Sequence, residues 1–108
     1  MAYCLAVKWT IKEGELDAVL AALAPLTEAS RAEPGCLMYQ AHRSPDDPNM
    51  IFLYEQYADE AGYEAHMASE HNRRFNAAFA GHIEGGASSL FWLTPSSAEP
   101  SAAAPSAP

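Results

Sequence analysis

The sequence is poor in basic residues and in cysteine. Its 108 residues include six lysines and arginines against 14 aspartates and glutamates, which gives a net charge of −8. Nucleic acids and anionic membrane surfaces are recognised by clustered basic side chains, so neither is an expected partner. The two cysteines, Cys4 and Cys36, form no C-x-x-C pair, and we expect them to be reduced residues of the core or of a strand.

Several motifs that carry chemistry are also absent. There is no G-x-G-x-x-G, no Walker A sequence, no H-E-x-x-H and no G-x-S-x-G. The sequence therefore predicts neither a nucleotide-cofactor site nor a serine-hydrolase elbow. No stretch approaches the ~18 apolar residues of a membrane span, and the first residues lack a basic region followed by a long apolar run. We expect a cytoplasmic protein.

Hydrophobic periodicity indicates four strands and two helical regions. Alternation predicts strands over residues 2–11, 36–43, 50–57 and 88–94, and helical spacing predicts helices over residues 15–32 and 59–79. The order βαββαβ is the ferredoxin-like pattern of an α+β fold. We expect residues 1–94 to form this single domain. Residues 95–108 contain only Pro, Ser, Ala and one Glu, which predicts a disordered tail.

Apolar side chains occupy both faces of the predicted sheet. In the first strand, odd-numbered positions carry large apolar residues, and three of the four even-numbered positions carry small ones. The two helical regions can cover only one face. Because an uncovered apolar sheet of this size is uncommon on a stable monomer, we predict a homodimer in which two sheets pack face to face.

The stretch Tyr54–Phe79 gathers the residues best suited to chemistry. It contains His66 and His71, which an uninterrupted helix would place about 140° apart. That spacing is not the i, i+4 pair of a helical metal site. A break near Ser69 would bring both toward one cavity, where either imidazole could act as a base near neutral pH. The alternative is that they lie on the surface or bond to backbone carbonyls.

Other candidates lie at the end of the third strand. Tyr54 and Tyr57 bring phenol groups there, and Glu55 lies between two aromatic residues, either on a solvated edge or paired with an arginine. Phe75 follows His71 at helical spacing and fits either a core stripe or the wall of a small-molecule pocket.

Three sequence features together resemble the antibiotic biosynthesis monooxygenase (ABM) domain family. They are the run Glu33-Pro34-Gly35-Cys36, the strand motif Tyr54-Glu55-Gln56-Tyr57, and His66 with His71 in an H-x-x-x-x-H helix. The resemblance covers residues 2–94. Relatives in this family include small quinol monooxygenases and the enzyme that processes phosphorylated autoinducer-2. Many members have Trp where this chain has Tyr57, and an aromatic residue where it has Asn72.

The resemblance implies a dimeric α+β barrel with a pocket in each subunit between sheet and helices. It also implies oxygenation of a small aromatic or quinol substrate by O₂, with no cofactor and no metal. In the resulting hypothesis, His66 takes the substrate's proton, with His71 as the second histidine, and Tyr54 or Tyr57 positions the oxygen. The expected substrate-binding residues are Trp9, Arg31, Phe52, Glu55, Phe75 and Trp92.

Three alternatives remain open. A proton-transfer isomerase of a phosphorylated hydroxy-ketone needs a cationic phosphate clamp, for which Arg31 is the best candidate. A haem-degrading relative needs an axial histidine, and His71 could serve. A non-catalytic dimeric ligand-binding module would have side chains filling the space beside His66.

Overall fold

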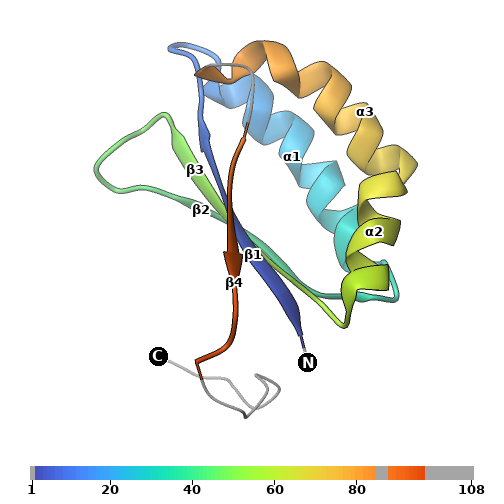
Figure 1. The fold of residues 1–108 in the computed structure, drawn as a ribbon. Coiled ribbons are helices and arrows are strands. Elements are labelled where there is room, and N and C mark those ends of the chain that lie inside the picture. Colours follow the sequence, from blue (N-terminus) through green and yellow to red (C-terminus); the bar gives the residue numbers. More distant parts are fainter. Residues whose placement is uncertain (1, 85–87, 97–108) are drawn as a thin grey trace.

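The computed structural model describes residues 2–84 and 88–96, which form an antiparallel sheet with helices packed on one side of it (Figure 1). The elements are β1 (Tyr3–Thr10), α1 (Leu16–Arg31), β2 (Cys36–Arg43), β3 (Met50–Tyr57), α2 (Glu60–Ala68), α3 (Glu70–Phe79), the 3₁₀ turn η1 (Ala80–His82) and β4 (Ser89–Leu93). The predicted ferredoxin-like α+β order is confirmed, with the second helical region divided in two. The predicted tail lies outside the described residues apart from positions 95 and 96.

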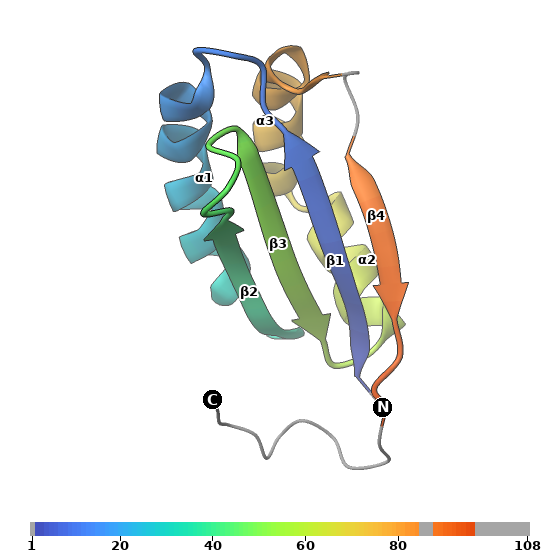
Figure 2. The ribbon, with the colours of Figure 1, turned by 90° about the vertical axis from the view of Figure 1, so that its left-hand side faces the viewer.

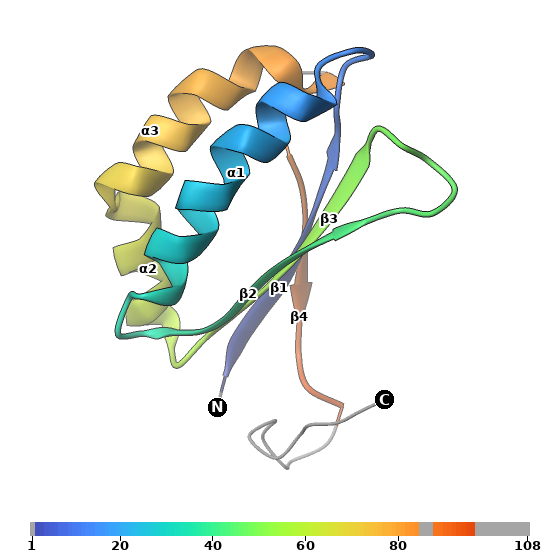
Figure 3. The ribbon, with the colours of Figure 1, turned by 180° about the vertical axis from the view of Figure 1, so that it is seen from behind.

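The sheet has the strand order β2-β3-β1-β4, and all neighbouring strands are antiparallel. Seen from behind, α1 and α3 lie side by side across the sheet, and α2 leads directly into α3 (Figure 3). Among the described residues, no helix combines the length and apolar character that a transmembrane helix needs. The cytoplasmic location expected from the sequence stays a prediction.

The register assigns each strand residue to one of the two sheet faces. Leu5 lies opposite Glu55 on β3 and Trp92 on β4, and these residues share the face that the helices cover. Ala6 lies opposite Tyr54 and Phe91 on the other face. Figure 2 views that second face with the helices behind the sheet, and no described element covers it.

The core fills the space between the sheet and the helices. The buried apolar side chains come from every layer of the fold: Leu5, Val7, Trp9, Ile51 and Leu53 from the sheet, and Val19, Leu23, Leu26, Phe75 and Phe79 from the helices. The ring of Trp9 lies 4.6 Å from that of Phe79, which stacks at 4.5 Å on Phe75. Burial of these residues holds α1 and α3 against the sheet.

Ser69 separates α2 from α3, as the sequence predicted. Its extended backbone ends α2, and its hydroxyl accepts a hydrogen bond from the backbone N–H of Asn72 at 3.2 Å. The same hydroxyl donates to the carbonyl of His66 at 2.6 Å. One serine therefore caps both helices and fixes the angle between them. Asp59 caps the start of α2, where its side chain accepts a hydrogen bond from the N–H of Gly62 at 2.9 Å.

Two glycines join the turn before β2 to the first turn of α2. A Cβ atom at Gly35 would lie 2.8 Å from the Cα of Gly62, and one at Gly62 would lie 3.0 Å from the carbonyl oxygen of Gly35. That oxygen also accepts a hydrogen bond from the N–H of Ala58 at 2.9 Å. The two backbones can approach this closely only because neither residue has a side chain.

We expect Gly35→Ala to destabilise the protein by about 1–3 kcal/mol, the usual cost of inserting a methyl group into a packed site. Gly81→Ala is the matched control, since a Cβ atom there meets nothing within 4 Å. Urea unfolding of both variants gives the comparison. Equal stability of Gly35→Ala and the control would show that the close contact is not needed.

Candidate functional site

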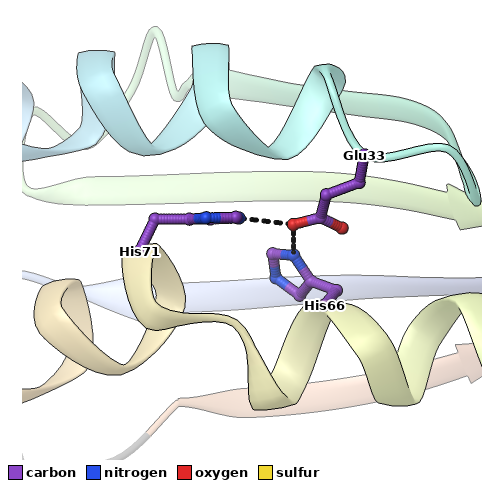
Figure 4. Close-up of side chains that lie close together, drawn as sticks. All are labelled: Glu33, His66 and His71. Carbon is purple, nitrogen blue, oxygen red and sulfur yellow. Dashed lines mark hydrogen bonds and ion pairs between the residues drawn. The ribbon is translucent and has the colours of Figure 1, made fainter.

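The break at Ser69 gives the two predicted histidines a common partner. His66 lies near the end of α2 and His71 near the start of α3, and their ring centroids are 6.1 Å apart. Both rings point toward Glu33, which lies in the turn between α1 and β2 (Figure 4). Oxygen Oε2 of Glu33 lies 2.9 Å from Nδ1 of His66 and 2.5 Å from Nε2 of His71.

The Glu33 contacts determine which nitrogens carry hydrogen. A carboxylate oxygen only accepts hydrogen bonds, so Nδ1 of His66 and Nε2 of His71 are the donors. Nε2 of His66 forms no hydrogen bond with any residue in the ranges 2–84 and 88–96. In a neutral imidazole with hydrogen on Nδ1, Nε2 is a free acceptor. This is the tautomer that a general base requires.

His66 is almost fully enclosed by other side chains. Only 2% of its surface is exposed, and its ring lies 5.5 Å from those of Tyr39 and Tyr57. Tyr39 comes from β2 and Tyr57 from β3, so the sheet forms the surface beneath the imidazole. Burial raises the pKa of both phenols above their ordinary value, which keeps them neutral hydrogen-bonding groups near neutral pH.

A cavity of about 120 Å³ adjoins the His66 ring, between the sheet and α2 and α3. Its lining is mostly apolar or aromatic, with a few polar groups: Leu5, Val7, Trp9, Leu26, Tyr39, Glu55, Tyr63, His66, Met67, Asn72, Phe75, Asn76, Ser88 and Leu90. The indole N–H of Trp9 donates to the hydroxyl of Ser88 at 2.6 Å. An apolar hollow with few convergent polar groups is the usual form of a small-molecule site.

Glu55 is the acidic group of the cavity wall. Burial raises the pKa of its carboxyl above the ordinary 4.5, and the neighbouring carboxylate of Glu33 acts in the same direction. A hydrogen bond from Tyr57 and the nearby His66 oppose that shift. The Tyr57 hydroxyl donates to Oε1 of Glu55 at 2.6 Å. Tyr57 therefore orients Glu55 and does not itself line the cavity.

Most of the site residues expected from the sequence lie in or next to the cavity beside His66. His66, Glu55, Trp9 and Phe75 line the cavity. His71 reaches His66 only through Glu33. Trp92 lies beside the site, where its ring meets that of Tyr63 edge to face at 5.1 Å.

Three expected residues lie elsewhere, and this corrects the sequence hypothesis for them. Tyr54 and Phe52 point to the uncovered sheet face, because they alternate with Glu55 along β3. Tyr54 therefore cannot position a substrate oxygen beside His66, and Phe52 is not a wall of this cavity. Arg31 donates from Nε to the carbonyl of Tyr39 and from a terminal nitrogen to Oε1 of Gln40, both at 2.9 Å. It is held at the β2 edge, outside the cavity.

Sequence reasoning did not select Glu33, Tyr39 or Asn72 as site residues. Glu33 begins the Glu33-Pro34-Gly35 turn that was noted for its family resemblance, and that was the available signal. Tyr39 lies in the predicted strand over residues 36–43, but nothing in that strand indicated that this side chain lies beneath His66. Asn72 is buried and lines the cavity one position after His71.

The chain resembles known proteins in both sequence and fold. The family model described as antibiotic biosynthesis monooxygenase matches residues 2–78, more than half of the chain. The solved structure of PA3566 from Pseudomonas aeruginosa is similar, with 28% identity and a TM-score of 0.82 over 89% of this chain and 95% of that one. So is a protein from Bacteroides thetaiotaomicron whose description names the same family, with 28% identity and a TM-score of 0.81 over 88% and 90% of the two chains.

A third solved structure, from Nitrosomonas europaea, is 24% identical and has a TM-score of 0.83 over 88% of this chain and 90% of its own, which supports the fold alone. The comparison with curated proteins gives no match. The family match covers β1 through most of α3 and includes Glu33, Glu55, His66 and His71. The chain therefore belongs to the antibiotic biosynthesis monooxygenase family.

Proposed function

We propose that this protein is a cofactor-independent monooxygenase that oxidises a small phenol or quinol with O₂ in the cavity beside His66. The observation that carries the proposal is the arrangement of His66. Its ring lines an apolar cavity, Nδ1 is bonded to Glu33, and Nε2 is left without a described partner. A buried base held in one tautomer by a carboxylate is suited to remove a proton from a bound substrate.

The reaction needs little more than a base and a dry site. His66 takes the hydroxyl proton of the substrate, and the resulting phenolate is electron-rich enough to give one electron to O₂. The aryloxyl radical and superoxide then combine at a ring carbon to form a peroxide, and loss of water leaves a quinone. One oxygen atom of O₂ enters the product and the other leaves as water, so the substrate supplies all the electrons.

Glu55 has a complementary role in this proposal. Burial favours its neutral form, and a neutral carboxyl can donate a hydrogen bond to an anion in the cavity, whereas a carboxylate would repel it. The Tyr57 hydroxyl fixes one oxygen of Glu55 and leaves the other for the substrate. When Glu55 is in its neutral form, His66 and Glu55 are a base and a hydrogen-bond donor on two walls of one cavity.

The structure gives less support to the three alternatives. Arg31, the candidate phosphate clamp, lies outside the cavity, and no other lysine or arginine of the described residues lines it. An axial haem ligand would have to line the cavity, and His71 is instead turned to Glu33. The non-catalytic dimeric ligand-binding module was expected to have side chains filling the space beside His66, where about 120 Å³ is open.

We further propose that the protein is a homodimer formed through the uncovered sheet face. The large apolar side chains Met38, Phe52, Phe91 and Leu93 on that face are between 37% and 47% exposed. Phe52 and Phe91 stack across β1 with ring centroids 6.4 Å apart. A second copy of the same face would bury these residues without using the helices or the cavity.

We expect His66→Ala to lower the rate of oxygen uptake with a panel of quinols and phenols by at least about 100-fold, the usual contribution of a positioned base. An oxygen electrode and the purified full chain suffice for the measurement. His82→Ala is a matched control, because His82 also bonds a glutamate, Glu15, at 2.6 Å but lies outside the cavity. Equal uptake by the His66 variant and the wild type would contradict the proposal.

The raised pKa of Glu55 predicts how stability changes with pH. Between its ordinary value of 4.5 and its higher folded value, the folded protein holds a proton that the unfolded chain has released. The stabilisation is complete below 4.5 and is lost as the pH rises through the folded pKa. Glu55→Gln cannot titrate, so its free energy of unfolding should decline less than the wild-type value between pH 4.5 and neutral pH. The free energy of unfolding of both proteins is measured by urea titration at several pH values. The same pH dependence for Glu55→Gln and the wild type would refute this prediction.

For the dimer, light scattering coupled to size exclusion should give twice the chain mass for the wild type. The double variant Phe52→Glu/Phe91→Glu should run as a monomer, because four like charges would meet in the interface. Met67→Glu, an exposed apolar residue on α2, should stay dimeric. A wild type of single-chain mass, or a dimeric double variant, would remove the basis for this interface.

A further inference from the structure

We propose that Glu33, His66 and His71 bind one divalent transition-metal ion of the zinc type. The three residues offer one oxygen and two imidazole nitrogens, and these ligand atoms all lie within 4.8 Å of one another. They come from three separate segments: the turn after α1, the end of α2 and the start of α3 (Figure 4). The proposal depends only on these positions and stands whether or not the protein is an oxygenase.

The spacing of the three atoms is close to that of a metal centre. Ligand atoms about 2.0–2.2 Å from a tetrahedral ion are roughly 3.4 Å from one another. Oxygen Oε2 of Glu33 now lies 2.9 Å from one histidine nitrogen and 2.5 Å from the other. An ion bound among them would require both contacts of this oxygen to lengthen to that spacing.

The charge of Glu33 is incompletely balanced. Its second oxygen, Oε1, is buried and has no hydrogen-bond partner. Among the described residues, the only ion-pair partners of Glu33 are the two histidines, and no lysine or arginine lies within reach. A buried carboxylate with one unpartnered oxygen is costly. A bound cation would neutralise it and could use that oxygen as well.

The donor set selects the class of ion. Imidazole nitrogen suits zinc, cobalt, copper and ferrous iron, whereas magnesium and calcium prefer oxygen ligands throughout. Two histidines and one carboxylate fill only part of a coordination sphere and leave positions for water.

An entry path exists on the helix side. The His71 side chain is 28% exposed, in contrast to the enclosed His66. It lines a groove of about 430 Å³ between α1 and α3, whose walls include Pro25, Ala29 and Arg74. An ion could reach His71 through this groove without passing through the cavity in which the substrate is proposed to bind.

Metal binding would also change the catalytic group, a consequence that rests on the proposed function. An ion on Nδ1 of His66 displaces the hydrogen there, so the neutral ring would carry hydrogen on Nε2 instead. That nitrogen could then no longer accept a proton from the substrate. The metal-bound and base-competent forms of His66 exclude each other.

The test uses the full chain freed of metal with EDTA. Titration with CoCl₂ should produce a d–d absorption band that saturates at one equivalent per chain, and calorimetry with ZnCl₂ should give the same stoichiometry. MgCl₂ should give no heat of binding. Glu33→Gln and His71→Asn should each weaken zinc binding by at least about 100-fold, because each change removes a group that contacts the ion directly.

His82→Asn is the control and should bind zinc as the wild type does, because no described residue adds a third ligand to the His82–Glu15 pair. Circular dichroism is used to check that each variant is folded. His71→Asn should fold, because it alters only a partly exposed side chain. No saturable cobalt band in the wild type would overturn the proposal. Unchanged zinc affinity in folded His71→Asn would overturn it equally.

Discussion

The candidate site depends on the hydrogen bonds that the Glu33 carboxylate accepts from two histidines. This carboxylate joins His66 on α2 to His71 on α3, and it lies in a turn that the Gly35–Gly62 approach holds against α2. The tautomer of His66 follows from its contact with the Glu33 carboxylate, because that oxygen can only accept the hydrogen on Nδ1.

One face of the sheet lines the cavity, and the other is the proposed dimer interface. On the helix side, strand residues such as Trp9 and Glu55 line the cavity together with His66. On the other side, Phe52 and Phe91 are exposed and apolar. Because side chains alternate along each strand, one short segment of β3 supplies both surfaces: Glu55 faces the site, and Phe52 faces the proposed partner.

The sequence predicted the fold and selected His66 as the candidate base, but it did not select Glu33, which bonds to the His66 ring. Strand alternation and helical spacing fixed the element order, and Ser69 identified the helix break that brings His66 and His71 together. Alternation also separates Tyr54 from Tyr57, but periodicity cannot say which face the helices cover, so Tyr54 and Phe52 were assigned to the wrong side. Glu33 lies 33 residues from His66, and only tertiary packing places it there.

The most direct test of the account concerns the hydrogen on the His66 ring. NMR of the metal-free full chain labelled with ¹⁵N in histidine distinguishes the two neutral tautomers through couplings between ring nitrogens and carbon-bound hydrogens. The account predicts hydrogen on Nδ1, bonded to Glu33, and a bare Nε2 at neutral pH. Hydrogen on Nε2 with a bare Nδ1 would contradict it, since the nitrogen beside the cavity could not then accept a proton.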